Sequence, residues 1–264
     1  MSDTTDNAPR STEPSDFQKL PQPIGVMAKS FADGSNIPLH HHDRDQLLYA
    51  IRGVMRLRTE QEAWVVPPDR AVYIPANTPH AVSMHGIVDM RTLYIAAGPS
   101  RAHDQSLRVL AVSSLLRELI LALSEEPIDY DIKSRGGLIA GLIELEVGRA
   151  RELSLSVPLP RDPRLQRLCA AILANPADRK TLDEWSAIAG ASPRTLARLF
   201  ERDVAMNFNK WRQRIRFHNA LEALSRGNPI SRVAKQNGYQ SASAFSAAFT
   251  KEMGIAPSKV SRDS

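Results

Sequence analysis

Apolar and polar residues alternate with a period of two over much of the N-terminal part of the chain. Residues 55–58 and 82–85 both show this alternation, which is typical of strands with one buried and one solvent-facing side. Turn-forming sequences, such as Asp33-Gly34 and the stretch 76–79, separate the alternating segments. Many short strands with no helical pattern between them predict a small antiparallel barrel or sandwich over residues 21–100.

The pattern changes to helical spacing beyond this region. Apolar residues recur at intervals of three and four over 104–124 and again over 138–147, which predicts two amphipathic helices within residues 101–152. The leucines of these helices either form a dimer interface or pack on the β domain. Prolines at 158, 160 and 163 end the helical pattern and predict a linker over 153–162. Residues 1–20 contain few large apolar side chains, so we expect a disordered tail there.

Residues 163–264 contain only helical patterns, interrupted by short turns. We expect the helices at 163–175, 182–189, 193–202, 208–224, 230–236 and 242–252. The sequence therefore predicts an α+β protein, with an N-terminal β-barrel and a C-terminal all-α domain.

Charge is distributed unequally between the two predicted domains. Residues 1–160 carry 16 Lys and Arg against 20 Asp and Glu, a net charge of −4. Residues 161–264 carry 18 against 9, a net charge of +9. A basic domain joined to an acidic one is typical of a module that binds a polyanion such as nucleic acid.

Composition excludes several classes of protein. The single cysteine, Cys169, excludes an internal disulfide and a zinc site built from several cysteines. No stretch reaches the roughly 18 apolar residues that a membrane span needs, and residues 1–16 lack the basic and apolar regions of a secretory signal. We therefore expect a cytoplasmic protein with no membrane partner.

The C-terminal domain contains two copies of one helical hairpin. Gly190 and Gly238 each follow the first apolar residue of their copy by eight positions. Glycine allows the left-handed backbone that ends a helix, and Ser192 and Ser241 are favoured N-cap residues for the helix that follows. Each copy therefore predicts a helix-turn-helix, a motif whose second helix enters the major groove of duplex DNA. The outward-facing residues of that second helix are Arg194, Thr195 and Arg198 in the first copy and Gln240, Ser243 and Ser246 in the second.

This domain resembles the DNA-binding domain of AraC-type (AraC/XylS) transcription regulators. The resemblance is carried by GASPRTLARLF at 190–200, WRQRIRF at 211–217, VAKQNGYQSASAFSAAF at 233–249 and GIAPS at 254–258. It implies two helix-turn-helix units that are joined by one long helix and placed in successive major grooves of double-stranded DNA. Ala247 stands where the family often has arginine, which implies that the second unit reads bases less than the first. Ala205 replaces a usual glycine and Val260 a usual tyrosine.

Three arginines of the joining segment are spaced too closely to share one helix face. These are Arg212, Arg214 and Arg216. Some of them are expected to contact phosphate, and others to form structural pairs with Asp183, Glu184 or Glu201.

The histidines of the N-terminal domain follow a second pattern. Residues 34–53 have the spacing G-x5-H-x-H-x3-Q-x6-G, and the sequence PANTPH follows at 75–80. Both resemble the two motifs of the cupin family. His40 and His42 point to the same side of a strand because side chains alternate, and Gln46 lies at an even offset on that side. The resemblance implies that His80 joins them from a neighbouring strand.

The predicted effector pocket consists of His40, His42, Gln46, Tyr49 and His80, and all of these except Tyr49 are candidate metal ligands. Three imidazoles suit Zn, Ni, Cu or Fe. Gln46 stands where the cupin family has a metal-binding glutamate, so the anionic ligand is missing and a redox iron site is less favoured. The alternative is a metal-free polar pocket that hydrogen-bonds a small-molecule effector. The sequence leaves both alternatives open and establishes no cofactor.

The two resemblances together predict a sequence-specific DNA-binding transcription regulator with a cupin-like domain that senses a small molecule or a metal. They imply a homodimer, RNA polymerase as a partner if the regulator is an activator, and control of nearby transport or catabolic genes. The alternative is a cupin metalloenzyme, a dioxygenase or isomerase, with an accessory helical domain. We favour a protein that is not an enzyme, because the glutamate is missing and no general acid–base pair is evident.

Overall fold

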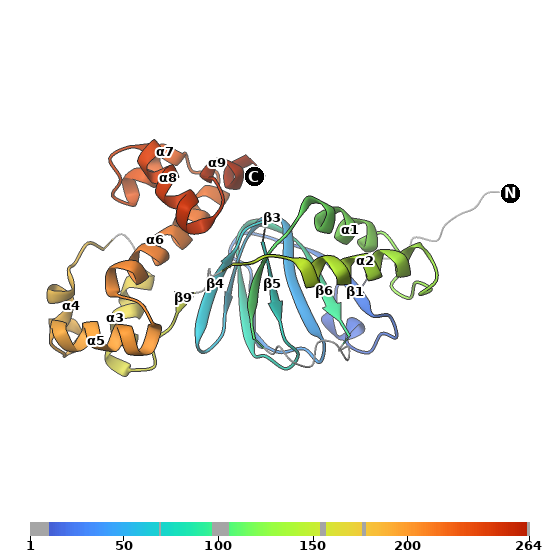
Figure 1. Cartoon of the computed structure of the whole chain (residues 1–264), viewed down its shortest axis with the longest axis horizontal. Coiled ribbons are helices and arrows are strands. Elements are labelled where there is room, and N and C mark those ends of the chain that lie inside the picture. Colours follow the sequence, from blue (N-terminus) through green and yellow to red (C-terminus); the bar gives the residue numbers. More distant parts are fainter. Residues whose placement is uncertain (1–10, 69, 97–105, 154–156, 176–177, 263–264) are drawn as a thin grey trace.

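The β domain lies at the centre of the molecule, between two groups of helices (Figure 1). The computed structural model describes residues 11–68, 70–96, 106–153, 157–175 and 178–262. An N-terminal sheet domain is followed by a C-terminal domain of helices, so the predicted fold class is confirmed. Within the described residues, no helix has the length and apolar character that crossing a membrane requires.

Nine strands in the described part of the chain form one antiparallel sheet that folds back on itself. The two long strands, β3 and β6, pair with each other and hold the two halves of the sheet together. The strands β1, β5, β7 and β8 extend one half, and β2, β4 and β9 extend the other. Their bounds are β1 Ile24–Phe31, β2 Asn36–His40, β3 Asp45–Arg58, β4 Glu62–Val66, β5 Arg70–Ile74, β6 His80–Ile95, β7 Arg108–Ala111, β8 Glu152–Leu153 and β9 Val157–Pro158.

A local irregularity in β3 allows the sheet to close around one interior. The register of β3 against β6 shifts between Ala50 and Val54. Gly53 lies in this stretch with φ +80, and a Cβ there would be 2.4 Å from the carbonyl oxygen of Ile87. Glycine is therefore required at this position, both for its backbone conformation and for the close approach of the two strands.

The predicted period-two alternation is confirmed on both sides of this irregularity. Met55, Leu57, Val82 and Met84 are at most 3 % exposed and belong to one interior cluster. The residues between them along the strands face outward.

Two helices cover the outer side of the half-sheet that contains β5 and β7. They are α1 (Ser114–Ser124) and α2 (Arg135–Arg149). Their buried stripe packs against the sheet and consists of Leu116, Ile120, Leu123, Ile139 and Ile143. Three leucines of α2 that belong to the predicted stripe are exposed instead: Leu138 (69 %), Leu142 (48 %) and Leu145 (63 %).

The helices α3 to α8 begin and end close to the predicted positions, whereas the last helix, α9, was not predicted. Their bounds are α3 Pro163–Ala174, α4 Leu182–Ala189, α5 Pro193–Val204, α6 Phe208–Ser225, α7 Ile230–Gln236, α8 Ala242–Met253 and α9 Pro257–Arg262. Ser192 and Ser241 are the N-caps of α5 and α8, as predicted, and Gly190 ends α4 with a left-handed backbone. Ala205 also adopts a positive φ, of 51°, at the end of α5, which is the conformation that glycine adopts most easily.

Two segments differ from their sequence predictions. The predicted disordered tail, 1–20, is ordered over the part that the structure describes: Pro14–Phe17 forms a 3-10 turn, and the Phe17 ring stacks on Tyr94. The physical reason is that one buried aromatic residue anchors an otherwise polar segment. Residues 1–10 lie outside the described residues.

The predicted linker, 153–162, is also pinned to the sheet. Its residues Val157–Pro158 form β9, which pairs with β4, and the Leu159 amide donates to the Gln61 carbonyl at 2.8 Å. Proline is tolerated here because β9 is an edge strand. A further difference concerns the helix predicted over 104–124. Its first part forms the strand β7 instead, and the helix α1 begins only at Ser114.

The C-terminal domain packs on the β domain through α6. This helix contacts β3, β4, β6 and β9. The indole Nε1 of Trp211 donates to the Pro158 carbonyl at 3.0 Å, so that the first turns of α6 are fastened to the connecting segment.

Candidate functional site

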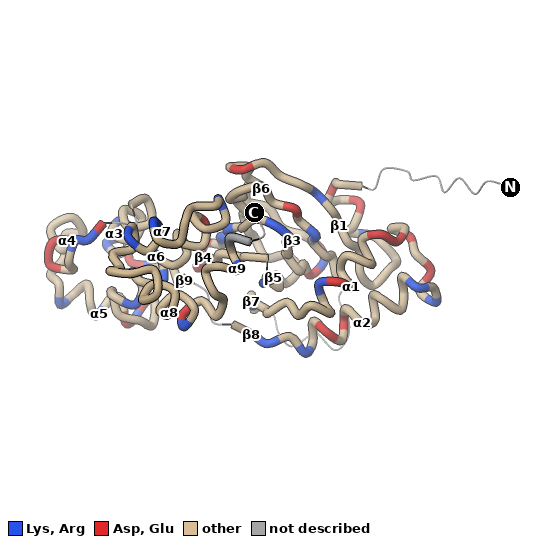
Figure 2. The backbone as a smooth tube through the Cα atoms, turned by 90° about the horizontal axis from the view of Figure 1, so that it is seen from above, with Lys and Arg blue, Asp and Glu red and all other residues tan. Residues whose placement is uncertain are grey.

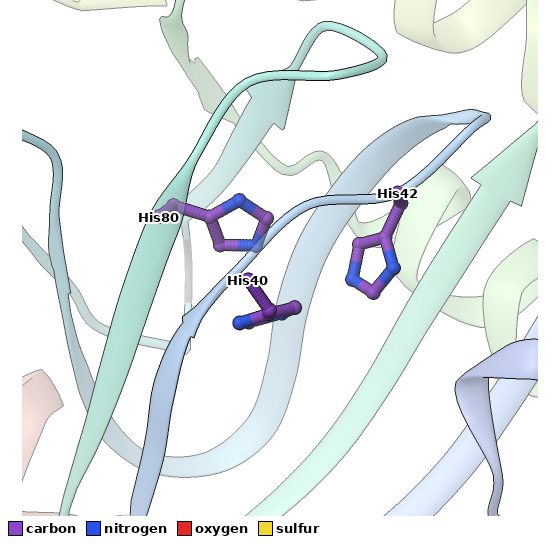
Figure 3. Close-up of side chains that lie close together, drawn as sticks. All are labelled: His40, His42 and His80. Atoms are coloured by element: carbon purple, nitrogen blue, oxygen red, sulfur yellow. The ribbon is translucent and has the colours of Figure 1, made fainter.

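Three histidines converge at one end of the β domain (Figure 3). His40 ends β2, His42 follows in the adjoining loop, and His80 begins β6. Each offers a ring nitrogen, and these three nitrogens all lie within 4.8 Å of one another. The ring centroids of His40 and His80 are 4.3 Å apart, and those of His40 and His42 are 4.8 Å apart. The structure therefore brings together the three histidines that the sequence pattern singled out.

Backbone carbonyls fix the orientation of two of the rings. Nδ1 of His40 lies 2.7 Å from the Pro38 carbonyl oxygen, and Nδ1 of His80 lies 2.8 Å from the Thr78 carbonyl oxygen. A carbonyl oxygen only accepts, so Nδ1 carries the proton in both rings and Nε2 of the neutral ring keeps its lone pair. Both Nε2 atoms are thus suited to bind a metal ion or to accept a hydrogen bond.

The site favours uncharged imidazoles. Burial, together with the neighbouring His40, lowers the pKa of His42 to about 3. Burial lowers the pKa of His80 to about 4, although its bond to Thr78 acts in the opposite direction. Within the described part of the chain, Nε2 of His42 and Nε2 of His80 are buried and have no hydrogen-bond partner. The arrangement thus holds two neutral imidazoles whose buried Nε2 atoms have no partner among the described atoms.

Gln46 lies in the same interior as the histidines. It is paired across the strands with Tyr94, whose ring contacts the His42 ring at a centroid distance of 4.9 Å. Its Nε2 donates to the Thr92 hydroxyl at 3.0 Å, whereas its Oε1 is buried without a partner among the described atoms. Thr92 contacts Gln46 and Tyr94 contacts His42, and both were missed from the sequence, although alternation along β6 from Met90 indicates that both face inward.

The prediction that Tyr49 belongs to this pocket is wrong. Tyr49 is fully buried on the opposite side of β3, in the cluster that α1 and α2 cover. The physical reason is the alternation of side chains along a strand: Gln46 and Tyr49 are three positions apart and so face opposite sides.

The two candidate recognition helices carry their predicted residues on or near the surface. In α5, Arg194 and Arg198 are exposed, and the half-buried Thr195 shares a hydrogen bond with the cap residue Ser192. Before and within α8, Gln240 and Ser243 are exposed. Ser246 is half-buried, and its hydroxyl donates to the Ala242 carbonyl at 2.7 Å. Figure 2 shows Lys and Arg distributed along the helices of this domain.

The three arginines of α6 have structural partners, but not those that were predicted. Nε of Arg214 lies 3.1 Å from the Glu252 carboxylate. Arg212 donates to the Lys180 carbonyl at 2.6 Å, and Arg216 to the Asp178 carbonyl at 2.9 Å. The expected acidic partners were wrong because the segment before α4 runs alongside α6 and presents its backbone carbonyls there.

Comparisons with known proteins identify both domains. A family described as "Cupin domain" matches residues 29–96, and a family described as "Helix-turn-helix domain" matches residues 185–263. The chain is 28% identical to the HTH-type transcriptional regulator NimR of Escherichia coli over 223 residues, which are 84% of this chain and 81% of the relative. It is 26% identical to the HTH-type transcriptional activator RhaR of Pectobacterium carotovorum, covering 84% of each chain.

Two solved structures illustrate the similarity of this chain to known folds. The C-terminal domain of AraT, a response regulator from Geobacillus stearothermophilus, is 29% identical, covers 38% of this chain and 85% of its own, and has a TM-score of 0.35. ToxT from Vibrio cholerae is 13% identical and covers 90% of this chain and 96% of its own, with a TM-score of 0.37.

The sequence relatives are named as transcription regulators, which agrees with the two matched domains and leaves the metalloenzyme alternative without support. This chain is therefore an AraC-type DNA-binding transcription regulator with an N-terminal cupin domain.

Proposed function

We propose that this regulator senses a divalent transition metal at His40, His42 and His80, and that occupancy of this site changes its binding to DNA. The observation that carries the proposal is the convergence of three imidazoles, two of which have buried Nε2 atoms without a partner among the described residues. Buried polar atoms in folded proteins are nearly always satisfied. A metal ion would satisfy both atoms, and neutral imidazole is a preferred ligand of Zn, Ni, Cu and Fe.

The chemistry of the donor set narrows the choice of metal. The described residues around the three rings include Gln46 where the cupin family has a carboxylate, so the ligands are all uncharged. Hard cations such as Mg²⁺ prefer oxygen ligands and are disfavoured here. Because the pKa values of His42 and His80 are low, protons compete weakly for these rings at neutral pH.

Metal binding is tested with metal-free protein prepared by chelation. Zn²⁺, Ni²⁺, Cu²⁺ and Fe²⁺ are titrated separately by calorimetry, and the stoichiometry is measured. We expect one ion per chain, and loss of binding in His42→Ala. The matched control is His41→Ala, because His41 is adjacent in sequence but exposed. Equal binding by both variants would refute the site, and a pocket that binds no metal would favour a small organic effector.

We further propose that α5 and α8 enter successive major grooves of duplex DNA. The supporting observation is that two exposed arginines of α5, Arg194 and Arg198, lie in its N-terminal half, where base edges are reached in helix-turn-helix proteins. Selection of bound duplexes from a random library at near-physiological salt tests this. Enrichment of a motif that spans two major grooves, about 34 Å or one helical turn apart, is expected. Binding without sequence preference would refute it.

The exposed leucines of α2 support a homodimer. Leu138, Leu142 and Leu145 are spaced by four and three residues and so share one face of the helix, away from the sheet. Sedimentation equilibrium is expected to give a dimer for the native chain and a monomer for Leu142→Lys. Glu144→Lys is the matched control, because Glu144 is exposed on another face of α2. If Leu142→Lys sediments like the native chain, this face is not the interface.

An effector can change DNA binding only if its affinity differs between two states of the protein. We propose that these states differ in the packing of α6 against the β domain. Operator affinity measured with and without the metal tests the coupling. If the metal leaves the affinity for the operator unchanged, metal binding does not regulate DNA binding.

A further inference from the structure

A cavity of about 400 Å³ lies between the two domains, on the outer side of the sheet. The β domain contributes one wall, from β2, β3, β4 and β6, and the helices α3 and α6 contribute the other. Arg56 and Arg58 line it from β3, whereas Met55 and Leu57 of the same strand point into the barrel interior. The cavity is therefore separated by the thickness of the sheet from the interior that contains the three histidines.

The cavity continues into a wider cleft. A second cavity, of about 1240 Å³, shares several of its lining residues, among them Arg58, Trp64 and Leu173. The inner cavity has the size of sites that hold a small organic molecule, which usually range from about 300 to 1,000 Å³. The outer cleft provides a route by which such a molecule can enter.

The inner cavity is lined by apolar side chains and by two arginines. Its apolar surface includes Val65, which faces the same side of the sheet as Arg56, together with Leu173 and Ile215 of the helices. Among the described residues that line it, two are arginines and none is aspartate or glutamate. The described lining of this cavity therefore contains no carboxylate that would repel an anion, whereas Glu60 and Glu62 line the outer cleft.

The two arginines differ in whether their guanidinium groups have partners. Arg56 is committed to the interface between the domains, because its guanidinium is paired with Glu222 and donates to Asn219 at 3.1 Å. Arg58 is exposed at the junction of the cavity and the cleft, and its guanidinium has no ion-pair or hydrogen-bond partner among the described residues. Arginine presents a planar fork of donors that matches a carboxylate.

We propose that this cavity is a second ligand site, which binds a small organic anion with an aromatic or aliphatic body and a carboxylate or sulfonate group. Arg58 binds the anionic group, and the body lies between Val65 of the β domain, which faces the same side of the sheet as Arg56, and Leu173 and Ile215 of the DNA-binding domain. Because both domains line the site, its occupant stabilises their docked arrangement. The site does not depend on the proposed metal at the histidines, so either can fail without the other.

The test uses the full chain and two fluorescent probes of nearly the same shape. Anilinonaphthalene sulfonate is an aromatic anion, and phenylnaphthylamine is its uncharged analogue. Loss of a charged hydrogen bond weakens binding by about tenfold or more. We therefore expect Arg58→Gln to weaken binding of the anion by about tenfold and Arg58→Lys to weaken it less, with little change for the neutral probe. Arg52→Gln is the matched control, because Arg52 is exposed on the same strand but does not line the cavity. Equal affinities for the anion in Arg58→Gln and Arg52→Gln would overturn the proposal.

A second pair of variants tests the location without changing charge. Leu173→Trp fills the cavity from α3, and Ala174→Trp places the same side chain on an exposed neighbouring position. Only Leu173→Trp is expected to abolish binding of the anion. His42→Ala, in the barrel interior, is expected to leave it intact. Loss of binding in His42→Ala with retention in Leu173→Trp would assign the anion to the barrel and refute the second site.

Discussion

The ion pair between Arg56 of β3 and Glu222 of α6 joins the cupin domain to the DNA-binding domain, and its removal is predicted to destabilise the chain. Glu222 is 7 % exposed, and its carboxylate also lies 3.3 Å from Nδ1 of His85. Burial lowers the pKa of His85 more than Glu222 raises it, so His85 is neutral at pH 7. The charge of Glu222 is therefore balanced by Arg56. Glu222→Gln keeps the shape of the side chain and leaves the guanidinium without its counter-charge.

The size of the effect follows from the burial of the two partners. Removing one member of a fully buried pair costs about 3–5 kcal/mol. The Arg56 side chain keeps 29 % of its surface in solvent and retains its bond to Asn219, both of which reduce the loss. We therefore expect the free energy of unfolding to fall by about 2 kcal/mol, which lowers Tm by about 4–8 °C for a chain of this size.

Thermal unfolding of the full chain measures this effect, and Glu201→Gln provides the matched control. Glu201 is exposed on α5, so its substitution should change stability by no more than about 0.5 kcal/mol. A double-mutant cycle with Arg56→Gln isolates the pair, and a coupling energy of about 1–2 kcal/mol is expected. If the coupling is zero, or if Glu222→Gln unfolds like Glu201→Gln, the ion pair does not hold the domains together.

Three further predictions concern the DNA-binding domain. Arg198→Ala is expected to weaken binding to a selected operator by about 1–3 kcal/mol and to relax the base preference at one position, measured by titration against variant duplexes; an unchanged preference would remove Arg198 from base reading. Thr181→Ala removes the capping box of α4 and should lower the free energy of unfolding by about 1 kcal/mol, whereas the exposed Thr250→Ala should not. Asp162→Ala removes the N-cap of α3 and should cost about 1 kcal/mol at pH 7. Hydrogen bonds from Arg164 lower the pKa of Asp162 to about 2 from the ordinary 3.8, so this difference from the native chain should be complete above pH 3.8 and shrink as the pH falls towards 2; a difference that does not change with pH would contradict the role of the carboxylate charge.

The local chemistry of the sequence determined where most of the elements begin and end. Gly190 ends α4 because it can adopt a left-handed backbone, and Ser192 and Ser241 start α5 and α8 because their hydroxyls accept free backbone amides. These effects act over a few residues and can be recognised without the rest of the chain. Side-chain alternation along β3 likewise predicts which residues face the interior. Because Tyr49 is three positions from the inward-facing Gln46, alternation places Tyr49 on the outer side.

Only the tertiary structure decided which distant residues meet. His80 reaches His40 and His42 because β6 pairs with β2, and the sequence suggested this meeting only through a family resemblance. Arg212 and Arg216 each donate a hydrogen bond to a backbone carbonyl of a distant segment, and a backbone carbonyl carries no signal in the sequence. The pair of Arg56 with Glu222 and the cavity beside it exist only because α6 docks on the outer side of the sheet. Side-chain alternation and helix capping are set by neighbours along the chain, whereas an interface between domains depends on the complementarity of two surfaces that form only after each domain has folded.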